Sequence, residues 1–214
     1  MYVSNATGCS SIWGGPASVS PYTVNKDSLQ GPAWANSLFE DNAEHGFGMQ
    51  LGQKVLREQA IEKLIAMNES EKATPEFKAA FEKFMETKEN TRTNTEATKA
   101  LLVEVEKAAE AGCPDAKAIL DKKEYLAKKS VWIFGGDGWA YDIGFGGLDH
   151  VLASGENVNV MVFDTEMYSN TGGQASKASN ICEVCQFAAA GKEMKKKSLA
   201  EIAMSYGYVY VAQI

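Results

Sequence analysis

The chain has 214 residues, 45% of them hydrophobic, so it is long enough to bury one sizeable core or two small ones. Its 21 Lys and Arg side chains against 28 Asp and Glu give a net charge of -7. That balance excludes the basic footprint of a nucleic-acid-binding protein and a polybasic membrane anchor, so we expect neither partner.

The sequence contains no targeting or membrane signal that we can identify. No apolar run approaches the roughly 18 to 20 residues that span a bilayer, and residues 1–6 lack the basic and apolar regions of a secretory signal. We therefore expect a place in the cytoplasm or in an organelle matrix. The cysteines are too few and too unevenly spaced for a disulfide framework, which favours reduced thiols or metal ligands: Cys9, Cys113, Cys182 and Cys185.

Residues 1–48 are rich in glycine, aromatic and small polar residues and show little periodicity. This composition favours ordered loops that bring the backbone close to a ligand. A frayed terminus with a linker is the alternative. Aromatic residues as dense as Trp34, Phe39 and Phe47 usually pack, which favours the ordered loops.

Residues 49–128 are rich in Lys, Glu and Ala, and their apolar residues recur at helical spacing. Pro75 is placed to begin one of these helices, because its missing N–H costs nothing at a first helical position. The pattern predicts an excursion of three or four helices. Interleaved Glu and Lys are typical of a solvated face over a core, so we expect this segment to be structural.

The next segment alternates between strand and helix signals. Residues 131–134 and 158–163 are short apolar runs that predict buried strands, and a helix is expected over residues 144–154 between them. Strand, helix and strand at this length form a parallel crossover unit. Its ligand crevice is expected at the carboxyl ends of the strands, where Asp137 and Thr165 fall.

The last part opens with a polar glycine loop over residues 168–174. Helices are then predicted over residues 185–192 and 198–205, and an apolar strand over 208–212. The three consecutive lysines at 195–197 are most simply a solvated turn.

Asp137, Thr165 and Asn170 offer oxygen atoms at the two predicted strand ends. Oxygen donors suit Mg²⁺ held by few protein groups, with diphosphate oxygens completing the coordination. Glycines follow at positions 136, 138, 144, 146 and 147. They would let the backbone approach a diphosphate. A Gly-Asp-Gly sequence alone could be a simple tight turn, but the ordered set of strands, glycines and polar residues favours a metal-diphosphate anchor.

With these motifs in place, the sequence resembles the thiamine-diphosphate-binding domain of pyruvate:ferredoxin (flavodoxin) oxidoreductases. The stretches that carry the resemblance are residues 5–12, 31–44, 136–144, 164–174 and 205–212. It implies an α/β, Rossmann-like fold with a mostly parallel sheet, interrupted by a helical excursion, and an incomplete domain.

The implied organisation has three parts. Residues 1–48 form a loop-rich segment on the cofactor and cluster side, residues 49–128 the helical excursion, and residues 129–214 a Mg²⁺-diphosphate-binding βαβ core.

The resemblance also implies roles for individual residues. Asp137, the Thr165 hydroxyl and the Met167 carbonyl match Mg²⁺ ligands. Three further residues match the lining of the diphosphate and thiazolium: Gly136, Gly138 and Trp139.

Three more positions match functional residues of the family. Asn170 matches a catalytic polar residue that faces the reacting carbon, and Thr7 matches a cofactor contact. Cys9 matches one of four thiolate ligands of a 4Fe-4S cluster; from its own surroundings it reads as a small buried residue.

The implied reaction is oxidative decarboxylation of pyruvate to acetyl-CoA and carbon dioxide, with electrons passing through iron-sulfur clusters to ferredoxin or flavodoxin. The implied partners are pyruvate, coenzyme A, the electron acceptor, the remaining domains of a longer parent chain and a second copy in a homodimer. A different 2-oxoacid, an NADP-linked fusion or a non-catalytic diphosphate-binding remnant are the alternatives.

Two features depart from the family pattern. The other cluster cysteines and the carboxylate that activates the cofactor would come from outside these residues, so we expect the segment alone to hold no cluster and to be inactive. Cys182 and Cys185 form a Cys-x-x-Cys pair where the family would have small residues. Incidental thiols are favoured over half of a zinc site or a redox pair.

Overall fold

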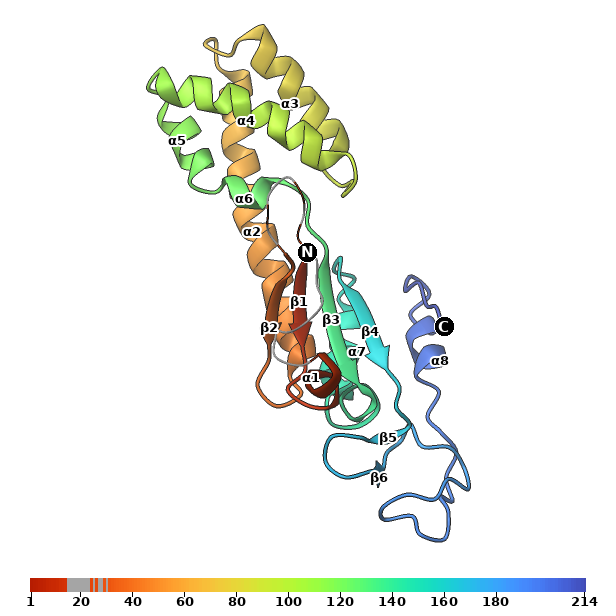
Figure 1. Cartoon of the computed structure of the whole chain (residues 1–214). Coiled ribbons are helices and arrows are strands. Elements are labelled where there is room, and N and C mark those ends of the chain that lie inside the picture. Colours follow the sequence, from red (N-terminus) through yellow and green to blue (C-terminus); the bar gives the residue numbers. More distant parts are fainter. Residues whose placement is uncertain (15–23, 25, 27–28, 30) are drawn as a thin grey trace. The chain divides into compact units, whose positions relative to one another are not determined.

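A computed structural model describes residues 1–14, 24, 26, 29 and 31–214 (Figure 1). The remaining residues fall in the segment predicted as ordered loops and lie outside the described part. The chain divides into two compact units. Unit 1 comprises Met1–Gln50 and Val131–Ile214, and unit 2 comprises Leu51–Ser130.

Unit 1 is built on a four-stranded parallel sheet in the order β2-β1-β3-β4 (Figure 1). Its strands are β1 (Tyr2–Asn5), β2 (Ala33–Asn36), β3 (Val131–Gly136) and β4 (Asn159–Phe163). The two predicted strands and their parallel pairing are confirmed by β3 and β4. The loop-rich segment contributes β1 and β2, whose sequences do not show the apolar runs that signal strands.

Helices flank this sheet. They are α1 (Cys9–Gly14), the π-helix η2 (Gly138–Ile143), α7 (Phe145–Ala153) and α8 (Leu199–Met204). The predicted helices over 144–154 and 198–205 are confirmed by α7 and α8. The core of unit 1 buries side chains from β3, η2 and α7, including Ile133, Trp139, Leu148 and Val151. The parallel crossover therefore forms because α7 closes one face of the sheet.

Two predictions for the last part of the chain are wrong. Residues 185–192 form no helix, because the Gln186 backbone bonds to the region of the short hairpin formed by β5 (Met167–Tyr168) and β6 (Gln174–Ala175). The amide of Ala175 donates to the Gln186 carbonyl at 2.9 Å. Those groups are then not available for a helical ladder.

Residues 208–212 form no strand. The preceding turn is tied instead to the end of α7, where the hydroxyls of Tyr206 and Tyr208 donate to the Asp149 carboxylate at 2.6 Å and to the Ala153 carbonyl at 2.9 Å. A strand needs a partner strand to pair its backbone groups, and an apolar sequence alone does not supply one.

Unit 2 is helical. It contains most of α2 (Asn42–Glu69), with α3 (Pro75–Thr87), α4 (Asn94–Glu110), α5 (Pro114–Leu120) and α6 (Lys123–Leu126). The Thr74 hydroxyl caps α3 by accepting from the amide of Phe77 at 3.2 Å. The apolar residues that recur at helical spacing meet in one core that includes Leu64, Phe84 and Leu101. The helical segment begins earlier than the predicted residue 49, since α2 begins at Asn42.

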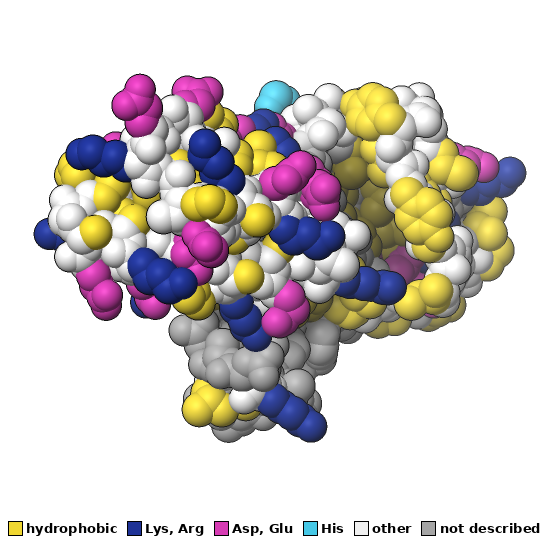
Figure 2. Space-filling view, turned by 90° about the horizontal axis from the view of Figure 1, so that it is seen from above, with side chains coloured by type: hydrophobic (Ala, Val, Ile, Leu, Met, Phe, Trp, Pro, Cys, Tyr) yellow, Lys and Arg dark blue, Asp and Glu magenta, His cyan; other side chains and the backbone are white. Residues whose placement is uncertain are grey.

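Charged side chains of both signs are interspersed over the face shown in Figure 2, among the residues that the structure describes. Such a surface carries no extended field of one sign, in keeping with the modest net charge. Within the described part of the chain, every helix is too short or too polar to cross a membrane.

Candidate functional site

A cluster of oxygen atoms lies at the carboxyl ends of β3 and β4. Asp137 directly follows β3 and is completely buried, and Thr165 follows β4. The Thr165 Oγ1 lies 2.8 Å from Asp137 Oδ1 and 3.1 Å from the Met167 carbonyl oxygen. The fold therefore brings together the three atoms that sequence comparison assigned to Mg²⁺, one each from a carboxylate, a hydroxyl and a carbonyl.

The second oxygen of the same carboxylate has a partner that the sequence did not reveal. Ser176, which is 5% exposed, donates from Oγ to Asp137 Oδ2 at 2.8 Å. Burial raises the pKa of Asp137, while the hydrogen bonds from Ser176 and Thr165 oppose that rise. Ser176 lies 39 positions from Asp137 in sequence, and no local pattern signals the contact.

These donors fit a hard divalent cation. No Lys or Arg in the described part of the chain forms an ion pair with Asp137, so the buried carboxylate lacks a positive partner from the protein. Mg²⁺ prefers oxygen ligands and commonly takes one or two carboxylates together with phosphate oxygens. Among the described residues no three His, Cys, Asp or Glu side chains cluster. The site has one carboxylate and draws its other protein oxygens from a hydroxyl and the backbone.

The glycines around Asp137 are required by close packing. A Cβ atom at Gly138 would lie 2.5 Å from Tyr168 Cε1, and one at Gly136 would lie 2.8 Å from Cys9 Cβ. Real Cβ atoms do not approach neighbours this closely, so only glycine fits without a shift of the structure. The Trp139 side chain is completely buried, so it belongs to the core and a ligand would meet its backbone.

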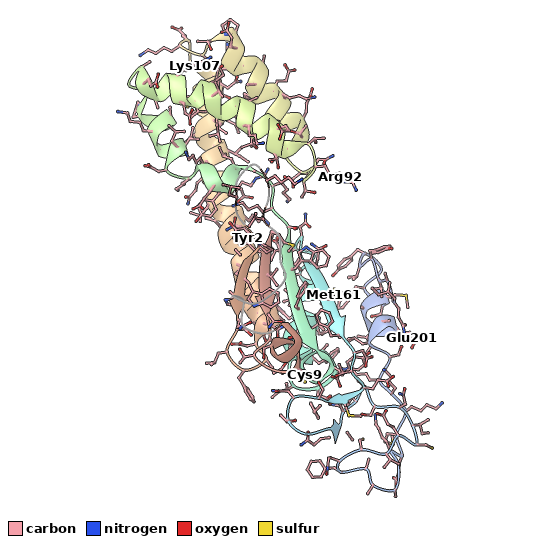
Figure 3. The ribbon with its side chains drawn as sticks, in the orientation of Figure 1. Tyr2, Cys9, Arg92, Lys107, Met161 and Glu201 are labelled. Atoms are coloured by element: carbon pink, nitrogen blue, oxygen red, sulfur yellow. The ribbon has the colours of Figure 1, made fainter. Side chains whose placement is uncertain are left out.

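The other predicted site residues lie at different places. Cys9 begins α1 near the carboxyl end of the sheet, opposite the Tyr2 end of β1 (Figure 3). Thr7 is exposed, and its hydroxyl donates to the Ser37 carbonyl. Asn170 is exposed in the turn between β5 and β6 and shares no hydrogen bond with Asp137 or Thr165 among the described residues. The structure therefore gathers the metal-side residues and leaves Asn170 apart.

Cys182 and Cys185 are both free thiols, the first exposed and the second half-buried. Their Cys-x-x-Cys spacing is not part of a metal cluster of His, Cys, Asp and Glu in the described ranges.

Two of the three lysines at 195–197 contradict the predicted solvated turn. The Lys196 ammonium lies 2.7 Å from Asp164 Oδ2, and the Lys197 ammonium donates to the Tyr141 carbonyl at 3.0 Å. Lys195 remains exposed. A lysine run in a sequence shows charge but not which member finds a partner after folding.

Glu40 is a further residue that the sequence analysis did not single out. It follows β2 in a left-handed conformation with φ of 65°, and its Oε2 is buried with no hydrogen bond to any described residue. Burial, followed by the negative charge of Asp137, raises the pKa of Glu40 to about 7. Long side chains can be buried in this way only at a cost when they are ionised.

This shift predicts a pH-dependent stability. The folded chain binds the Glu40 proton more tightly than the unfolded chain, whose ordinary value is 4.5. Stability is therefore lost as pH rises from about 4.5 to about 7. We expect Glu40→Gln to raise the free energy of unfolding by about 1 kcal/mol at pH 8, after allowance for partial exposure, and to leave it nearly unchanged at pH 4.

Urea unfolding of both proteins at the two pH values checks this expectation. Glu193→Gln, at an exposed position, is the matched control and should leave the pH dependence unaltered. An equal effect of Glu40→Gln at both pH values would contradict it.

Comparisons with known proteins show the family of the chain. Residues 116–214 match the family described as "Thiamine pyrophosphate enzyme, C-terminal TPP binding domain". The whole chain is 54% identical to pyruvate:ferredoxin oxidoreductase of Moorella thermoacetica and 50% identical to pyruvate-flavodoxin oxidoreductase of Klebsiella pneumoniae, covering 18% of each. It is 48% identical over 99% of its length to mitochondrial pyruvate dehydrogenase [NADP(+)] of Euglena gracilis, of which it covers 12%.

The chain thus spans less than a fifth of the length of these relatives. The match confirms the predicted α/β, Rossmann-like thiamine-diphosphate-binding fold, whose parallel sheet the structure shows. The chain belongs to the pyruvate:ferredoxin and pyruvate-flavodoxin oxidoreductase family, and residues 116–214 match its C-terminal thiamine pyrophosphate-binding domain.

Proposed function

We propose that this chain anchors the diphosphate of thiamine diphosphate through Mg²⁺, within a pyruvate oxidoreductase. The observation that carries the proposal is a chain of oxygen contacts that begins at the buried Asp137 carboxylate. The Thr165 hydroxyl contacts that carboxylate and the Met167 carbonyl, and no Lys or Arg among the described residues pairs with Asp137. A diphosphate carries several negative charges, so a divalent ion between it and Asp137 would compensate both.

The chain's own residues would hold and orient the group. Asp137, Thr165 and Met167 would supply the metal ligands. Ser176 holds the second oxygen of the Asp137 carboxylate and so fixes its orientation. Gly136 lets Cys9 pack closely against the backbone next to Asp137. When bound, thiamine diphosphate supplies an electron sink for decarboxylation of a 2-oxoacid.

The wider activity that we propose is oxidative decarboxylation of pyruvate to acetyl-CoA and carbon dioxide. Electrons would leave through iron-sulfur clusters to ferredoxin or flavodoxin, with Cys9 as one thiolate ligand of a 4Fe-4S cluster. The names of the relatives support the substrate and acceptor. We further propose that Thr7 contacts the cofactor, that Asn170 faces the reacting carbon, and that other domains of a homodimeric parent protein complete the site.

Removal of the metal is the first test. We expect calorimetry to detect thiamine diphosphate binding to the chain in the presence of Mg²⁺, and affinity to fall roughly tenfold or more, about 1.4 kcal/mol, when EDTA is added. The physical reason is that two sets of negative charges would then face each other without a cation. Binding that is independent of Mg²⁺, or no binding at all, would overturn the proposal.

A second candidate is an NADP-linked pyruvate dehydrogenase, because one relative carries that name. The anchor would be unchanged and only the electron acceptor would differ. Assaying the parent protein with ferredoxin, flavodoxin and NADP⁺ in parallel separates the two functions. A non-catalytic diphosphate-binding remnant would reduce none of the three.

A further inference from the structure

The loop that follows β4 is held by an ion pair between Lys196 and Asp164. The Lys196 ammonium lies 2.7 Å from Asp164 Oδ2, and both side chains are 29% exposed. The Tyr141 hydroxyl donates to the same oxygen at 2.7 Å, and Lys196 lies 5.8 Å from the centroid of the Tyr141 ring. Partial burial and two donors on one oxygen make this pair stronger than an exposed surface salt bridge.

The other oxygen of the same carboxylate shapes the backbone. Asp164 Oδ1 accepts from the amide of Glu166 at 3.1 Å, closing a turn over two residues. Glu166 has φ of 66°, a left-handed conformation that a non-glycine residue adopts only when its surroundings impose it. The Ser179 hydroxyl also donates to the Glu166 carbonyl. Asp164 is therefore one of the groups that hold this strained turn.

The turn carries two of the proposed metal ligands. Thr165 precedes Glu166 and Met167 follows it, so the left-handed residue sets how the Met167 carbonyl lies against the Thr165 hydroxyl, which in turn contacts Asp137. If Glu166 relaxed to an ordinary conformation, the Met167 carbonyl would no longer lie beside the Thr165 hydroxyl that contacts Asp137. The ligand geometry therefore depends on the contacts of Asp164.

The distribution of charge around Asp137 and Asp164 also supports a role for Lys196. Asp164 and Asp137 are two acidic groups at one edge of the sheet. Lys196 offsets the charge of Asp164 at 2.7 Å and lies 3.8 Å from Glu166 Oε1, on the turn itself, but forms no ion pair with Asp137. Lys197 is engaged elsewhere, with the Tyr141 carbonyl. A cation bound at Asp137 would then be attracted by a carboxylate that has hydrogen-bond partners but no positively charged partner among the described residues.

We propose that Lys196 is a positioning residue of the metal-diphosphate site, which holds Asp164 and through it the turn that presents Thr165 and Met167 to Mg²⁺. The inference rests on the proposed function of the same site. The ion pairs of Lys196 are with Asp164 and Glu166, so it would act through the geometry of the turn.

The test measures the Mg²⁺ concentration at which thiamine diphosphate binding is half-maximal, by calorimetry on the full 214-residue chain. We expect Lys196→Met to raise this concentration about tenfold, the range typical of residues that orient metal ligands. Lys196→Arg, which keeps the charge, should bring it back to within about threefold of the original value. Lys195→Met removes the same charge from the exposed neighbouring position and should leave it unchanged.

Saturating Mg²⁺ separates positioning from simple damage to the fold. If Lys196 acts through the ligand turn, excess metal restores the cofactor affinity of Lys196→Met, whereas a merely structural loss would persist. Asp164→Asn provides a second variant should Lys196→Met fail to fold, and it should shift the same Mg²⁺ dependence.

Three outcomes decide the matter. A shift in Lys196→Met or Asp164→Asn that Mg²⁺ restores supports the proposal. Unchanged Mg²⁺ dependence in the folded variants overturns it and leaves the proposed function standing. Failure of the unsubstituted chain to bind thiamine diphosphate in a Mg²⁺-dependent way overturns the proposed function and this inference with it.

Discussion

Asp137→Ala is expected to weaken Mg²⁺-dependent binding of thiamine diphosphate about 100-fold or more, equivalent to about 2.7 kcal/mol. Asp137 is the one carboxylate among the three oxygen donors, and it is completely buried. Its removal takes away the only negative charge among the proposed protein ligands, while the Thr165 hydroxyl and the Met167 carbonyl remain as neutral donors. Neutral oxygens alone hold Mg²⁺ weakly.

Calorimetric titration with thiamine diphosphate at fixed Mg²⁺ measures this loss. Asp137→Asn separates charge from shape, because the amide keeps the size of the side chain, and we expect it to lose nearly as much affinity. Asp115→Asn, on the helical unit, removes a carboxylate far along the sequence and should bind as the original chain does. Binding by Asp137→Ala within threefold of that control would contradict the assignment of the site.

Trp139→Ala is expected to lower the free energy of unfolding by about 3–5 kcal/mol. Trp139 has the largest of the fully buried side chains in the described part of the chain. Its ring packs directly on two glycines, since a Cβ at Gly135 would lie 2.2 Å from Trp139 Cε3 and one at Gly144 would lie 2.1 Å from Trp139 Cδ1. Truncation leaves a cavity beside Gly135 and Gly144, close in sequence to the proposed metal ligand Asp137.

Urea unfolding followed by circular dichroism gives the free energy. Trp139→Phe is expected to cost less, because the smaller ring still fills much of the space and removes an indole N–H that has no described partner. Tyr210→Ala is the matched control for loss of an aromatic ring, since Tyr210 is 92% exposed, and its change should stay within about 0.5 kcal/mol. A cost of Trp139→Ala as small as that of the control would refute the packing argument.

The sequence pattern predicted the elements whose buried positions are occupied by apolar residues. β3 and β4 are continuous apolar runs, and the helices of unit 2 repeat their apolar positions at helical spacing. β1 escaped that pattern because two of its four residues are buried and polar. The Ser4 hydroxyl donates to the Asn42 carbonyl at 2.9 Å, and the Asn5 amide donates to Asn36 Oδ1 at 3.0 Å.

Residues 208–212 show the opposite error. Their alternation of tyrosine and valine has strong strand propensity, yet no strand forms in this structure. Propensity describes how well a segment suits a sheet, while pairing depends on which edge lies beside it. Tyr206 and Tyr208 are bonded to the end of α7.

For the site itself, the sequence alone determined the residues that stand directly at strand ends. Asp137 between glycines and Thr165 follow apolar strands and could be placed at one sheet edge from connectivity rules, whereas Met167 was assigned only through the family resemblance. Only the tertiary structure decided which distant polar groups lie at this site. Ser176 bonds to Asp137, Lys196 pairs with Asp164, and Glu40 packs beside Gly8. The reason is physical: periodicity encodes which face of an element is buried, whereas hydrogen bonds and ion pairs between distant segments depend on how the elements pack.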